Sequence, residues 1–404
     1  MMTRSEITSM VDSMPVYSDH EHHQPDAFFA AGMSLDKVLN HSYVGWMGFP
    51  ADGTEEGRKR LLDNVRFNSY FIWLERGLQR LHGIDDPITL ETWQTISDRI
   101  ASAHGTDPEF HWKSLQEHGY ERLIQDSYWN PGDDNGHPEL FATTFRIDKF
   151  MYGYHRDIIA PDNVQPWSHY GFDGGTLDDY VALMGTTIQS RVESGSAVAL
   201  KCAEAYNRPI SFTPDDRDTA EAIFGRRPES VDQKSFYRFG NYIFHRCCEL
   251  AGELDIPLQV HTGLARLGGS SPMNLLPIIE AYPTTRFVLF HSGYPWTQEV
   301  AALAHNYPNV FPSLTWTATI CTNTAIRTLH DYIEVSPSIN RITWGSDCWT
   351  PEESIGAQLA WRYIVARVIF ERIEHGMLRA AEADLLARKL LFENGRTIYG
   401  KGKL

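Results

Sequence analysis

Short apolar runs recur along the chain, and each run ends in a polar or small residue and is followed by a stretch with helical periodicity. Most of the runs are almost continuously apolar, which is typical of parallel strands that helices cover on both faces. Eight strands alternating with helices predict either a closed (β/α)8 barrel or an open doubly wound sheet. We expect the strands at residues 15–18, 121–126, about 145–154, 197–201, 257–261, 286–291, 309–314 and 342–347.

The residues at the ends of these runs separate the two architectures. Most of the runs end in His, Lys or Asp. In a (β/α)8 barrel, side chains at the C-terminal ends of different strands converge on one site. A doubly wound sheet favours a glycine-rich phosphate turn after its first strand, and the sequence has none there. We therefore predict an α/β fold of the (β/α)8, or TIM barrel, type.

Residues 24–117 interrupt this rhythm after the first strand. The segment has a helical pattern, is rich in large aromatic residues, and is far longer than the usual βα loop of about 2–6 residues. We interpret it as a helical insertion that covers the barrel mouth as a lid, within one domain formed by residues 1–404. A separate helical domain without a role at the site is the alternative. Residues 203–246, with several prolines, are expected to form a long loop that leads into a helix over residues 236–252.

The composition narrows the partners and the compartment. The 52 acidic residues against 36 basic ones leave a net charge of −16, whereas nucleic-acid binding is driven largely by Lys and Arg. We find neither the apolar core of a signal peptide nor an apolar run near the roughly 20 residues that span a bilayer. The five cysteines include no CxxC pair, which argues against disulfides and a thiolate zinc site. We expect a cytoplasmic protein that binds a small molecule, neither nucleic acid nor membrane, and that forms a homo-oligomer.

Four histidines and one aspartate stand where predicted strands end. His20 and His22 follow the first run, and because alternate residues of a strand point to the same side, their imidazoles can face one ion. His261 and His291 end two consecutive runs, and Asp347 ends the last one. A carboxylate beside a barrel core is costly unless it is paired or bound to a cation. The alternatives are ordinary polar histidines and a helix-capping role for the aspartate.

Neutral imidazole and carboxylate are the ligands that divalent Zn, Mn and Fe accept. We expect zinc at this site, with manganese or iron as alternatives. Such an ion lowers the pKa of a bound water to about 7, so that a nucleophile is available at neutral pH and a nearby carboxylate can accept its proton. The residue types therefore predict metal-assisted chemistry.

The order of these residues resembles the amidohydrolase superfamily, which has His-x-His after strand 1, His after strands 5 and 6, and Asp after strand 8. Residues 291–296, 341–347 and 393–400 are most similar to its amidohydrolase-related (amidohydrolase 2) branch. The length and the tryptophan-rich helices of residues 24–117 are instead reminiscent of uronate isomerases, a distant branch.

The resemblance implies a role for each of the five residues. His20, His22, His261 and Asp347 would bind the metal, and Asp347 would also carry the proton from the water to the leaving group. His291 would be either a further ligand or the group that polarises the substrate carbonyl.

Lys201 ends the fourth predicted strand, and several roles are open to it. In binuclear amidohydrolases a carboxylated lysine at this strand end bridges two metals. The stretch is also similar to a segment of amidohydrolase domains that are fused or related to glutamine synthetases. A free lysine would donate a hydrogen bond to substrate or lie as a cation beside the metal, whereas a solvent-facing one would have no role. We favour one metal ion over two.

Five residues in the expected βα loops are candidates for substrate binding. Tyr206 and Arg208 lie beyond strand 4 and Arg266 beyond strand 5, where a guanidinium group can bind a substrate carboxylate through two hydrogen bonds or simply pair within the acidic surface. Trp296 and Trp349 follow two of the expected ligands, and they can line a pocket for an apolar or ring-bearing substrate or pack at its rim.

We therefore expect a metal-dependent hydrolase that cleaves a C–N (amide-like) or ester bond in a small carboxylated metabolite. Fold does not fix the reaction, so a metal-dependent decarboxylase and a uronate-type aldose–ketose isomerase are alternatives. An inactive barrel that serves as a binding module is the alternative outside enzymology.

Overall fold

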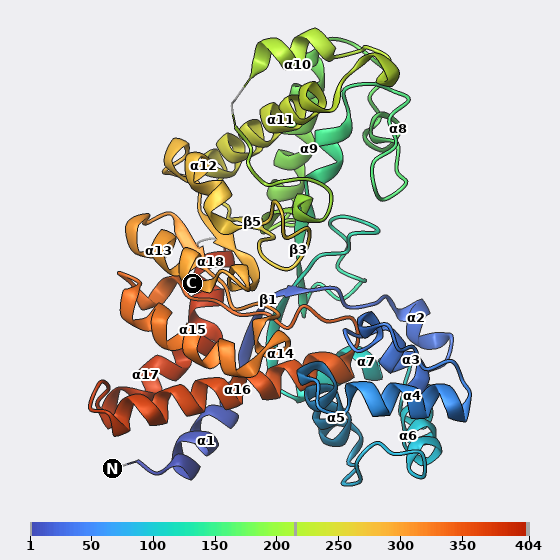
Figure 1. Cartoon of the computed structure of the whole chain (residues 1–404), viewed down its shortest axis with the longest axis vertical. Coiled ribbons are helices and arrows are strands. Elements are labelled where there is room, and N and C mark those ends of the chain that lie inside the picture. The colour runs from blue at the N-terminus through green and yellow to red at the C-terminus, as the bar shows by residue number, and fades with distance from the viewer. Residues whose placement is uncertain (1, 214–215, 401–404) are drawn as a thin grey trace.

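The computed structural model describes residues 2–213 and 216–400. Seven parallel strands form one sheet in which each strand pairs with its neighbours along the chain (Figure 1). This architecture confirms the expected α/β class with a parallel sheet. The strands are β1 (Val16–Glu21), β2 (Tyr120–Gln125), β3 (Phe141–Arg146), β4 (Ala199–Cys202), β5 (Leu258–Val260), β6 (Phe287–Leu289) and β7 (Val310–Pro312).

The segment expected as the eighth strand, residues 342–347, joins the two edges of this sheet without forming a regular strand. On one side the Thr343 N–H donates to the carbonyl of Pro312 in β7 at 3.1 Å. On the other side the Asp19 N–H of β1 donates to the carbonyl of Trp344 at 2.9 Å. The sheet is thus closed into a ring by an irregular seam between its last and first members.

The prediction of a strand at about residues 145–154 was wrong over most of its length. Strand β3 ends at Arg146, and the 3-10 helix η2 (Asp148–Tyr152) follows it. The Asp148 carboxylate accepts a hydrogen bond from the Ala203 N–H at 3.0 Å and so holds the chain in a turn. Phe150 and Met151 are apolar because they pack into the core, not because they extend a strand.

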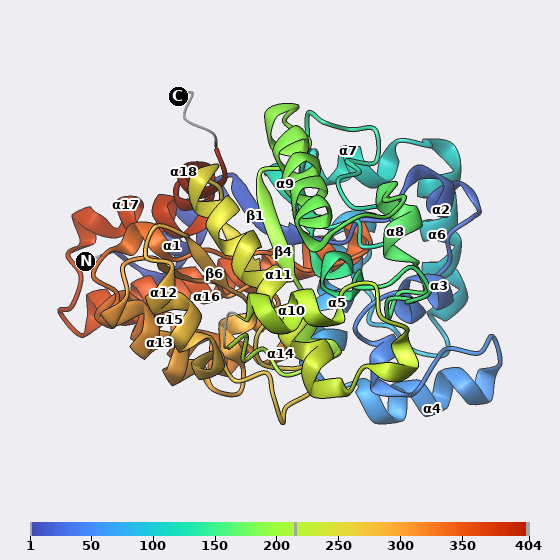
Figure 2. The ribbon, with the colours of Figure 1, turned by 90° about the horizontal axis from the view of Figure 1, so that it is seen from above.

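Helices cover the outside of the ring, as the view from above shows (Figure 2). The helix expected at residues 236–252 is the central part of α11, which begins earlier because Asp232 accepts a hydrogen bond from the Ser235 N–H at 2.9 Å. The helices outside the β1–β2 connection are α1 (Arg4–Asp12), α8 (Pro166–Tyr170), α9 (Leu177–Glu193), α10 (Arg217–Ile223), α11 (Gln233–Glu253), α12 (Leu276–Ala281), α13 (Thr297–Asn306), α14 (Thr317–Ile320), α15 (Thr322–Val335), α16 (Pro351–Glu374), α17 (Ala383–Arg388) and α18 (Asn394–Tyr399).

The expectation of a long loop over residues 203–246 was wrong in part. The segment contains η3 (Glu204–Tyr206), α10 and the first part of α11. Helix α10 forms because the Asp216 carboxylate caps its first turn by accepting a hydrogen bond from the Thr219 N–H at 2.8 Å.

The β1–β2 connection (residues 22–119) forms a group of helices with a hydrophobic core of its own. Phe29, Leu35, Leu61, Phe71 and Trp93 are among the buried residues of this core. Figure 1 shows the group beside the ring, next to one end of the long helix α16. Its elements are α2 (Asp26–Ala30), α3 (Leu35–Asn40), η1 (Gly45–Met47), α4 (Glu55–Val65), α5 (Ser69–His82), α6 (Trp93–Thr106) and α7 (Phe110–Glu117).

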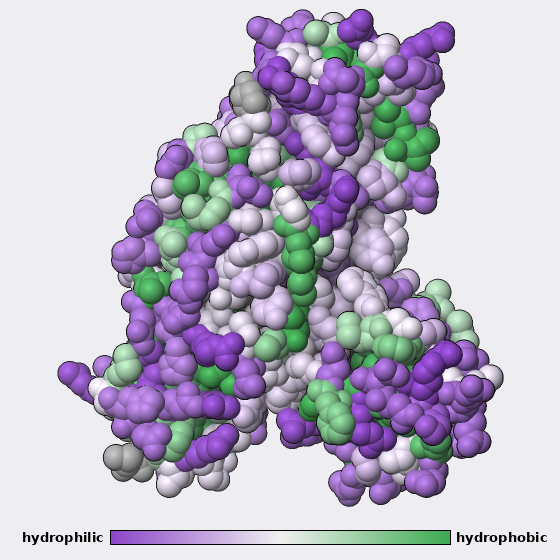
Figure 3. Space-filling view, viewed as in Figure 1, coloured by the Kyte–Doolittle hydropathy of each residue, from purple (hydrophilic) through white to green (hydrophobic). Residues whose placement is uncertain are grey.

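The surface is mostly polar on the face shown in Figure 3, and the outline is indented between the part that carries α8–α11 and the part that carries α2–α6. Among the described helices, none combines the length and the apolar character that crossing a bilayer requires.

Candidate metal centre

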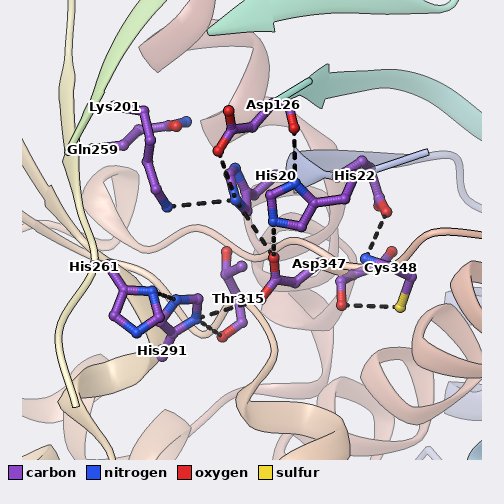
Figure 4. Close-up of polar contacts among 12 residues, drawn as sticks. His20, His22, Asp126, Lys201, Gln259, His261, His291, Thr315, Asp347 and Cys348 are labelled. Carbon is purple, nitrogen blue, oxygen red and sulfur yellow. Dashed lines mark hydrogen bonds and ion pairs between the residues drawn. The ribbon is translucent and has the colours of Figure 1, made fainter. Parts of the chain in front are cut away.

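Strand β1 and the seam beside it bring three ligand groups together. His20 lies in β1, and His22 follows it, held by a hydrogen bond from its N–H to the Cys348 carbonyl at 2.9 Å. The Asp347 N–H donates to the His20 carbonyl at 2.9 Å, which places its carboxylate opposite both imidazoles. Oδ1 of Asp347 lies 3.4 Å from Nε2 of His20 and 3.3 Å from Nε2 of His22 (Figure 4).

These distances fit a shared cation. Ligand atoms at about 2.0–2.1 Å from a tetrahedral zinc ion lie about 3.3 Å from one another. The ligand atoms of His20, His22 and Asp347 all lie within 4.8 Å of one another, and all three residues are buried. Nδ1 of His22 donates to the Asp126 carbonyl at 2.8 Å, so Nε2 keeps the free lone pair that a metal needs.

Non-glycine residues with left-handed backbone conformations cluster at this end of the ring. His291, Trp316 and Asp347 have φ angles of 62°, 62° and 63°. Each such conformation costs about 1–3 kcal/mol and persists only where the surroundings enforce it, typically at functional sites. The strain therefore marks the same region as the ligand cluster.

Lys201 lies beside the cluster and does not face solvent, which excludes the solvent-facing alternative. Its Nζ is 3.4 Å from Nε2 of His20 and 3.9 Å from the ring centroid of Phe290. Burial lowers the pKa of Lys201 to about 8, although Asp126 and Asp347 oppose this effect. The ammonium form consequently still predominates at neutral pH.

His261 and His291 form a pair at the edge of the cluster. Nδ1 of His261 lies 2.9 Å from Nε2 of His291, and Nε2 of His261 lies 2.9 Å from the Leu264 carbonyl. Nδ1 of His291 is 3.8 Å from Oδ2 of Asp347. Burial lowers the pKa of both histidines, that of His261 to about 3, so both are neutral at pH 7. His261 therefore reaches the ligand group through His291 and not directly.

Tyr43 enters the site from the β1–β2 connection and was not anticipated. Its hydroxyl donates to Oδ2 of Asp347 at 2.7 Å, and its ring stacks on Trp316 with centroids 4.6 Å apart. Burial, followed by the charge of Asp347, raises the pKa of Tyr43 well above its ordinary value. The phenol thus remains a hydrogen-bond donor, and no pattern in the sequence distinguishes it from the other tyrosines of this segment.

Asp126 and Arg146 extend the polar centre and were also missed. The two side chains form an ion pair, and Oδ2 of Asp126 is 3.8 Å from Nε2 of His20. Burial raises the pKa of Asp126, but the positive charges around it, with the Arg146 guanidinium as the largest contributor, together outweigh this effect and the net shift is downward. Asp126 ends the expected run 121–126, so the strand-end rule that selected Lys201 could have found it. Arg146 ends β3 but stood near the start of the run expected at about 145–154, so the rule could not select it.

The five expected substrate-binding residues fall into different environments. Tyr206 is 43% exposed, and its ring centroid is 4.4 Å from that of His261. Trp349 stacks on His22 with centroids 5.6 Å apart. Both therefore border the candidate metal centre, whereas Trp296 is half-buried before the start of α13.

The two candidate arginines are engaged within the protein. Arg208 is buried and donates to Oδ1 of Asn241 at 2.5 Å and to the Tyr237 carbonyl at 2.9 Å. Arg266 is exposed and donates to the Asn207 carbonyl at 2.7 Å. Arg146 is the arginine that lies at the metal centre.

A cavity of about 210 Å³ adjoins the centre on the side of Arg146 and Tyr206. Arg146 belongs both to its wall and to the ion pair with Asp126, so the cavity and the ligand cluster share a side chain. The other residues that line it are Tyr128, Asp148, Lys149, Tyr152, Ala160, Pro161, Asp162, Ala203, Glu204 and Asn207.

Comparison with solved structures finds chains of similar fold. A uronate isomerase from Thermotoga maritima has a similar fold, with a TM-score of 0.77 and 16% identity, covering 98% of this chain and 97% of the other. A Lactobacillus casei chain assigned as a metal-dependent hydrolase gives 0.72 and 14%, covering 97% of each chain. These likenesses concern the fold.

Protein fluG of Emericella nidulans is 34% identical over 230 residues, which are 52% of this chain and 26% of that relative. The chain thus spans about a quarter of the length of this curated relative. The family model described as amidohydrolase matches residues 199–400, which carry Lys201, His261, His291 and Asp347. The chain therefore belongs to the amidohydrolase family.

Proposed function

We propose that the protein is a metal-dependent hydrolase that cleaves a C–N (amide-like) or ester bond in a small carboxylated metabolite. The observation that carries the proposal is the convergence of His20 Nε2, His22 Nε2 and Asp347 Oδ1 at the strand ends of a parallel ring. Membership of the amidohydrolase family supports an enzyme.

The donor set suits one divalent ion, for which we propose zinc. His20, His22 and Asp347 would hold it, with His291 beside them. When bound, the ion supplies a Lewis acid that polarises a substrate carbonyl and increases the acidity of water. Lys201 occupies the place next to His20 as a buried cation, which favours one ion over two.

Asp347 is proposed as the group that moves the proton. Its Oδ1 faces the two histidines, while Oδ2 accepts the hydrogen bond of Tyr43. This arrangement leaves the carboxylate fixed in orientation and close to the place where water would be activated. It can accept a proton there and deliver it to the leaving group.

Lys201 and His291 are proposed to stabilise the negative charge that develops on the substrate oxygen. Lys201 is a buried cation, and buried donors aimed at developing charge act more strongly than donors in water. Burial keeps His291 neutral, so it would act as a hydrogen-bond donor or as a further ligand.

The substrate is proposed to lie between the metal centre and the cavity beside Arg146. Tyr206 and Trp349 border this space, and the Arg146 guanidinium supplies a positive charge for a carboxylate. We further propose that residues 24–117 form a lid over this mouth, because Tyr43 and Trp46 of that segment contact Asp347, Trp316 and Trp349.

A uronate-type aldose–ketose isomerase is the second candidate. The fold likeness to a uronate isomerase extends over 98% of the chain, including the helices between β1 and β2, and Arg146 and Lys149 in the wall of the cavity offer positive charge for a sugar acid. The proton carried by Asp347 would then move between two carbons of an open-chain sugar acid.

One experiment separates the two candidates. The zinc-loaded protein is incubated with a panel of N-acyl amino acids and lactones and with a panel of uronic acids, and the products are analysed by mass spectrometry. A hydrolase yields products that together contain one added water, whereas an isomerase yields a product of unchanged mass. Asp347→Asn is the control, and turnover that this variant retains at the wild-type rate would refute the proposed proton carrier in either reaction.

A further inference from the structure

A second group of metal-ligand side chains lies away from the barrel centre, where the β1–β2 connection meets the loop between β2 and β3. Asp26 starts α2, His111 lies in α7 and His137 lies in that loop. Oδ1 of Asp26 is 3.1 Å from Nε2 of His111 and 3.0 Å from Nε2 of His137. All three ligand atoms lie within 4.8 Å of one another.

His111 carries the most informative atom of this group. Its side chain is fully buried, and among the residues that the structure describes its Nε2 has no hydrogen-bond partner, because the contact with Asp26 lacks hydrogen-bond geometry. A buried polar atom without a partner costs about 1–3 kcal/mol. A cation shared by the nitrogen and the carboxylate removes this cost and explains the short distance without an aligned N–H group.

The spacing of the three atoms suits a tetrahedral ion. Ligand atoms at about 2.0–2.2 Å from zinc are separated by about 3.3–3.5 Å, close to the two distances from the Asp26 carboxylate. A second His–His–carboxylate group, His82, His104 and Glu352, shows the contrast. There both imidazoles make hydrogen bonds to the same carboxylate oxygen, at 3.1 and 2.8 Å, whereas Asp26 has such a bond only with His137, at 3.0 Å, and His111 is left without one.

His111 also has a hydrogen-bond partner for its second ring nitrogen. Nδ1 of His111 is 3.0 Å from Nε2 of His23. Metal-binding histidines almost always have such an outer partner, which fixes the orientation of the ring.

We propose that Asp26, His111 and His137 bind a second divalent transition-metal ion of the zinc type. The Asp26 side chain is 63% exposed, so the remaining coordination position is open to water. The ion would fasten α2 and α7 to the loop after β2, and thereby hold the β1–β2 connection against the ring. His23, which contacts His111, follows His22 directly and links this site to the barrel centre.

Zinc content tests the proposal on the full chain. Wild type, Asp26→Asn, His137→Gln and the double variant His20→Ala/His22→Ala are loaded with zinc, desalted and analysed for zinc per chain. His330→Gln is the matched control, because His330 pairs with Glu371 at 3.0 Å in a simple surface ion pair. Asp26 is exposed, so its replacement by Asn leaves the fold intact, and circular dichroism verifies this.

We expect about two zinc ions in wild type and in His330→Gln, and about one in Asp26→Asn and His137→Gln. The double variant His20→Ala/His22→Ala should keep its one peripheral ion, which Asp26→Asn should remove. Chelator competition should show that the affinity of that ion falls by roughly 100-fold or more in Asp26→Asn, a larger loss than outer-shell changes cause. If Asp26→Asn and His137→Gln both kept the same amount of zinc per chain as wild type, the proposal would be overturned. This outcome does not depend on how much zinc the barrel centre binds.

Discussion

Asp347 uses its two carboxylate oxygens for different contacts, and Tyr43 controls one of them. Oδ1 faces His20 and His22, whereas Oδ2 accepts the Tyr43 hydroxyl at 2.7 Å. Tyr43→Phe removes this hydrogen bond and keeps the ring that stacks on Trp316. We expect turnover by the zinc-loaded enzyme to fall by about 10–100-fold, because the outer partner of a ligand typically contributes that much. Steady-state kinetics on the substrate found in the product screen measures it.

Tyr70→Phe is the control for this change. The Tyr70 ring stacks on Tyr43 with centroids 5.2 Å apart, but in the described part of the chain its hydroxyl makes no hydrogen bond to Asp347. The control should keep turnover within about twofold of wild type, as expected for a change away from the ligands. Equal losses in both variants would mean that aromatic packing, and not the hydrogen bond, supports the site.

These residues also show which parts of the candidate site could be predicted from the sequence. His20, His22 and Asp347 could be predicted to meet, because strand ends of a parallel ring converge wherever the strands lie along the chain. Tyr43 could not, since it arrives from a helical segment whose path depends on tertiary packing. The hydrogen bond of His261 to the Leu264 carbonyl was equally invisible, because ring orientation depends on local loop geometry.

At the scale of elements, α5 and α16 cross with their backbones in close approach. A Cβ atom at Gly77 would lie 2.1 Å from the Glu352 carbonyl oxygen, and one at Gly356 would lie 2.3 Å from that of Trp73. Gly77→Ala should therefore destabilise the protein by roughly 1–3 kcal/mol through overpacking, despite the better helix propensity of alanine. Urea unfolding followed by circular dichroism measures the change.

Gly185→Ala in α9 serves as the comparison, because a Cβ there meets nothing within 4 Å. Its stability should rise by up to about 1 kcal/mol, the propensity difference alone. If Gly77→Ala also stabilised the protein, the close crossing of α5 and α16 would be refuted.

Glu352 links the same two elements electrostatically. Burial alone would raise its pKa, but His104 and His82 outweigh burial and hold the pKa below its ordinary value of 4.5. A carboxyl group with a depressed folded pKa contributes stability that is complete above the unfolded pKa and is lost as the pH falls below it. Glu352→Gln should thus cost roughly 1.5–3 kcal/mol at pH 7, and this difference from wild type should shrink below pH 4.5.

Urea unfolding of both proteins at pH 7, 5 and 4 tests this dependence. Glu374→Gln, at the exposed end of the same helix, should change stability by less than about 0.5 kcal/mol at each pH. The assigned role of the carboxylate would be contradicted if the loss of unfolding free energy in Glu352→Gln, relative to wild type, stayed constant or grew toward pH 4.

The strands could be predicted from the sequence where an apolar run forms a strand and no other element. The runs at 197–201, 257–261, 286–291 and 309–314 coincide with β4 to β7, because helices bury both faces of these strands. The run at 145–154 misled because core 3-10 helices are as apolar as strands. The last run forms a seam without a regular strand and ends at Asp347, whose left-handed conformation side-chain patterns do not encode.

For the whole molecule, the candidate metal centre lies across the seam that closes the ring. His20 belongs to the first strand, His22 directly follows that strand, and Asp347 belongs to the last segment; irregular hydrogen bonds join the first strand to the last segment. An ion held by all three would cross-link the ends of the sheet, and only the folded chain offers that geometry. Binding to the folded state alone adds about 2.7 kcal/mol of stability when free zinc is 100 times Kd.

Chelation of the ion should therefore lower the melting temperature, because it removes the cross-link between the two ends of the sheet. In an Asp26→Asn background, which removes the proposed peripheral ion, EDTA should reduce the melting temperature of the zinc-loaded protein by about 3 °C, given the unfolding entropy of a 404-residue chain. Differential scanning calorimetry measures the shift, and added His22→Ala should abolish it because one ligand of the seam is gone. If EDTA still lowered the melting temperature of this double variant, the stabilising ion would bind at another site. Metal binding would then not stabilise the closure of the ring.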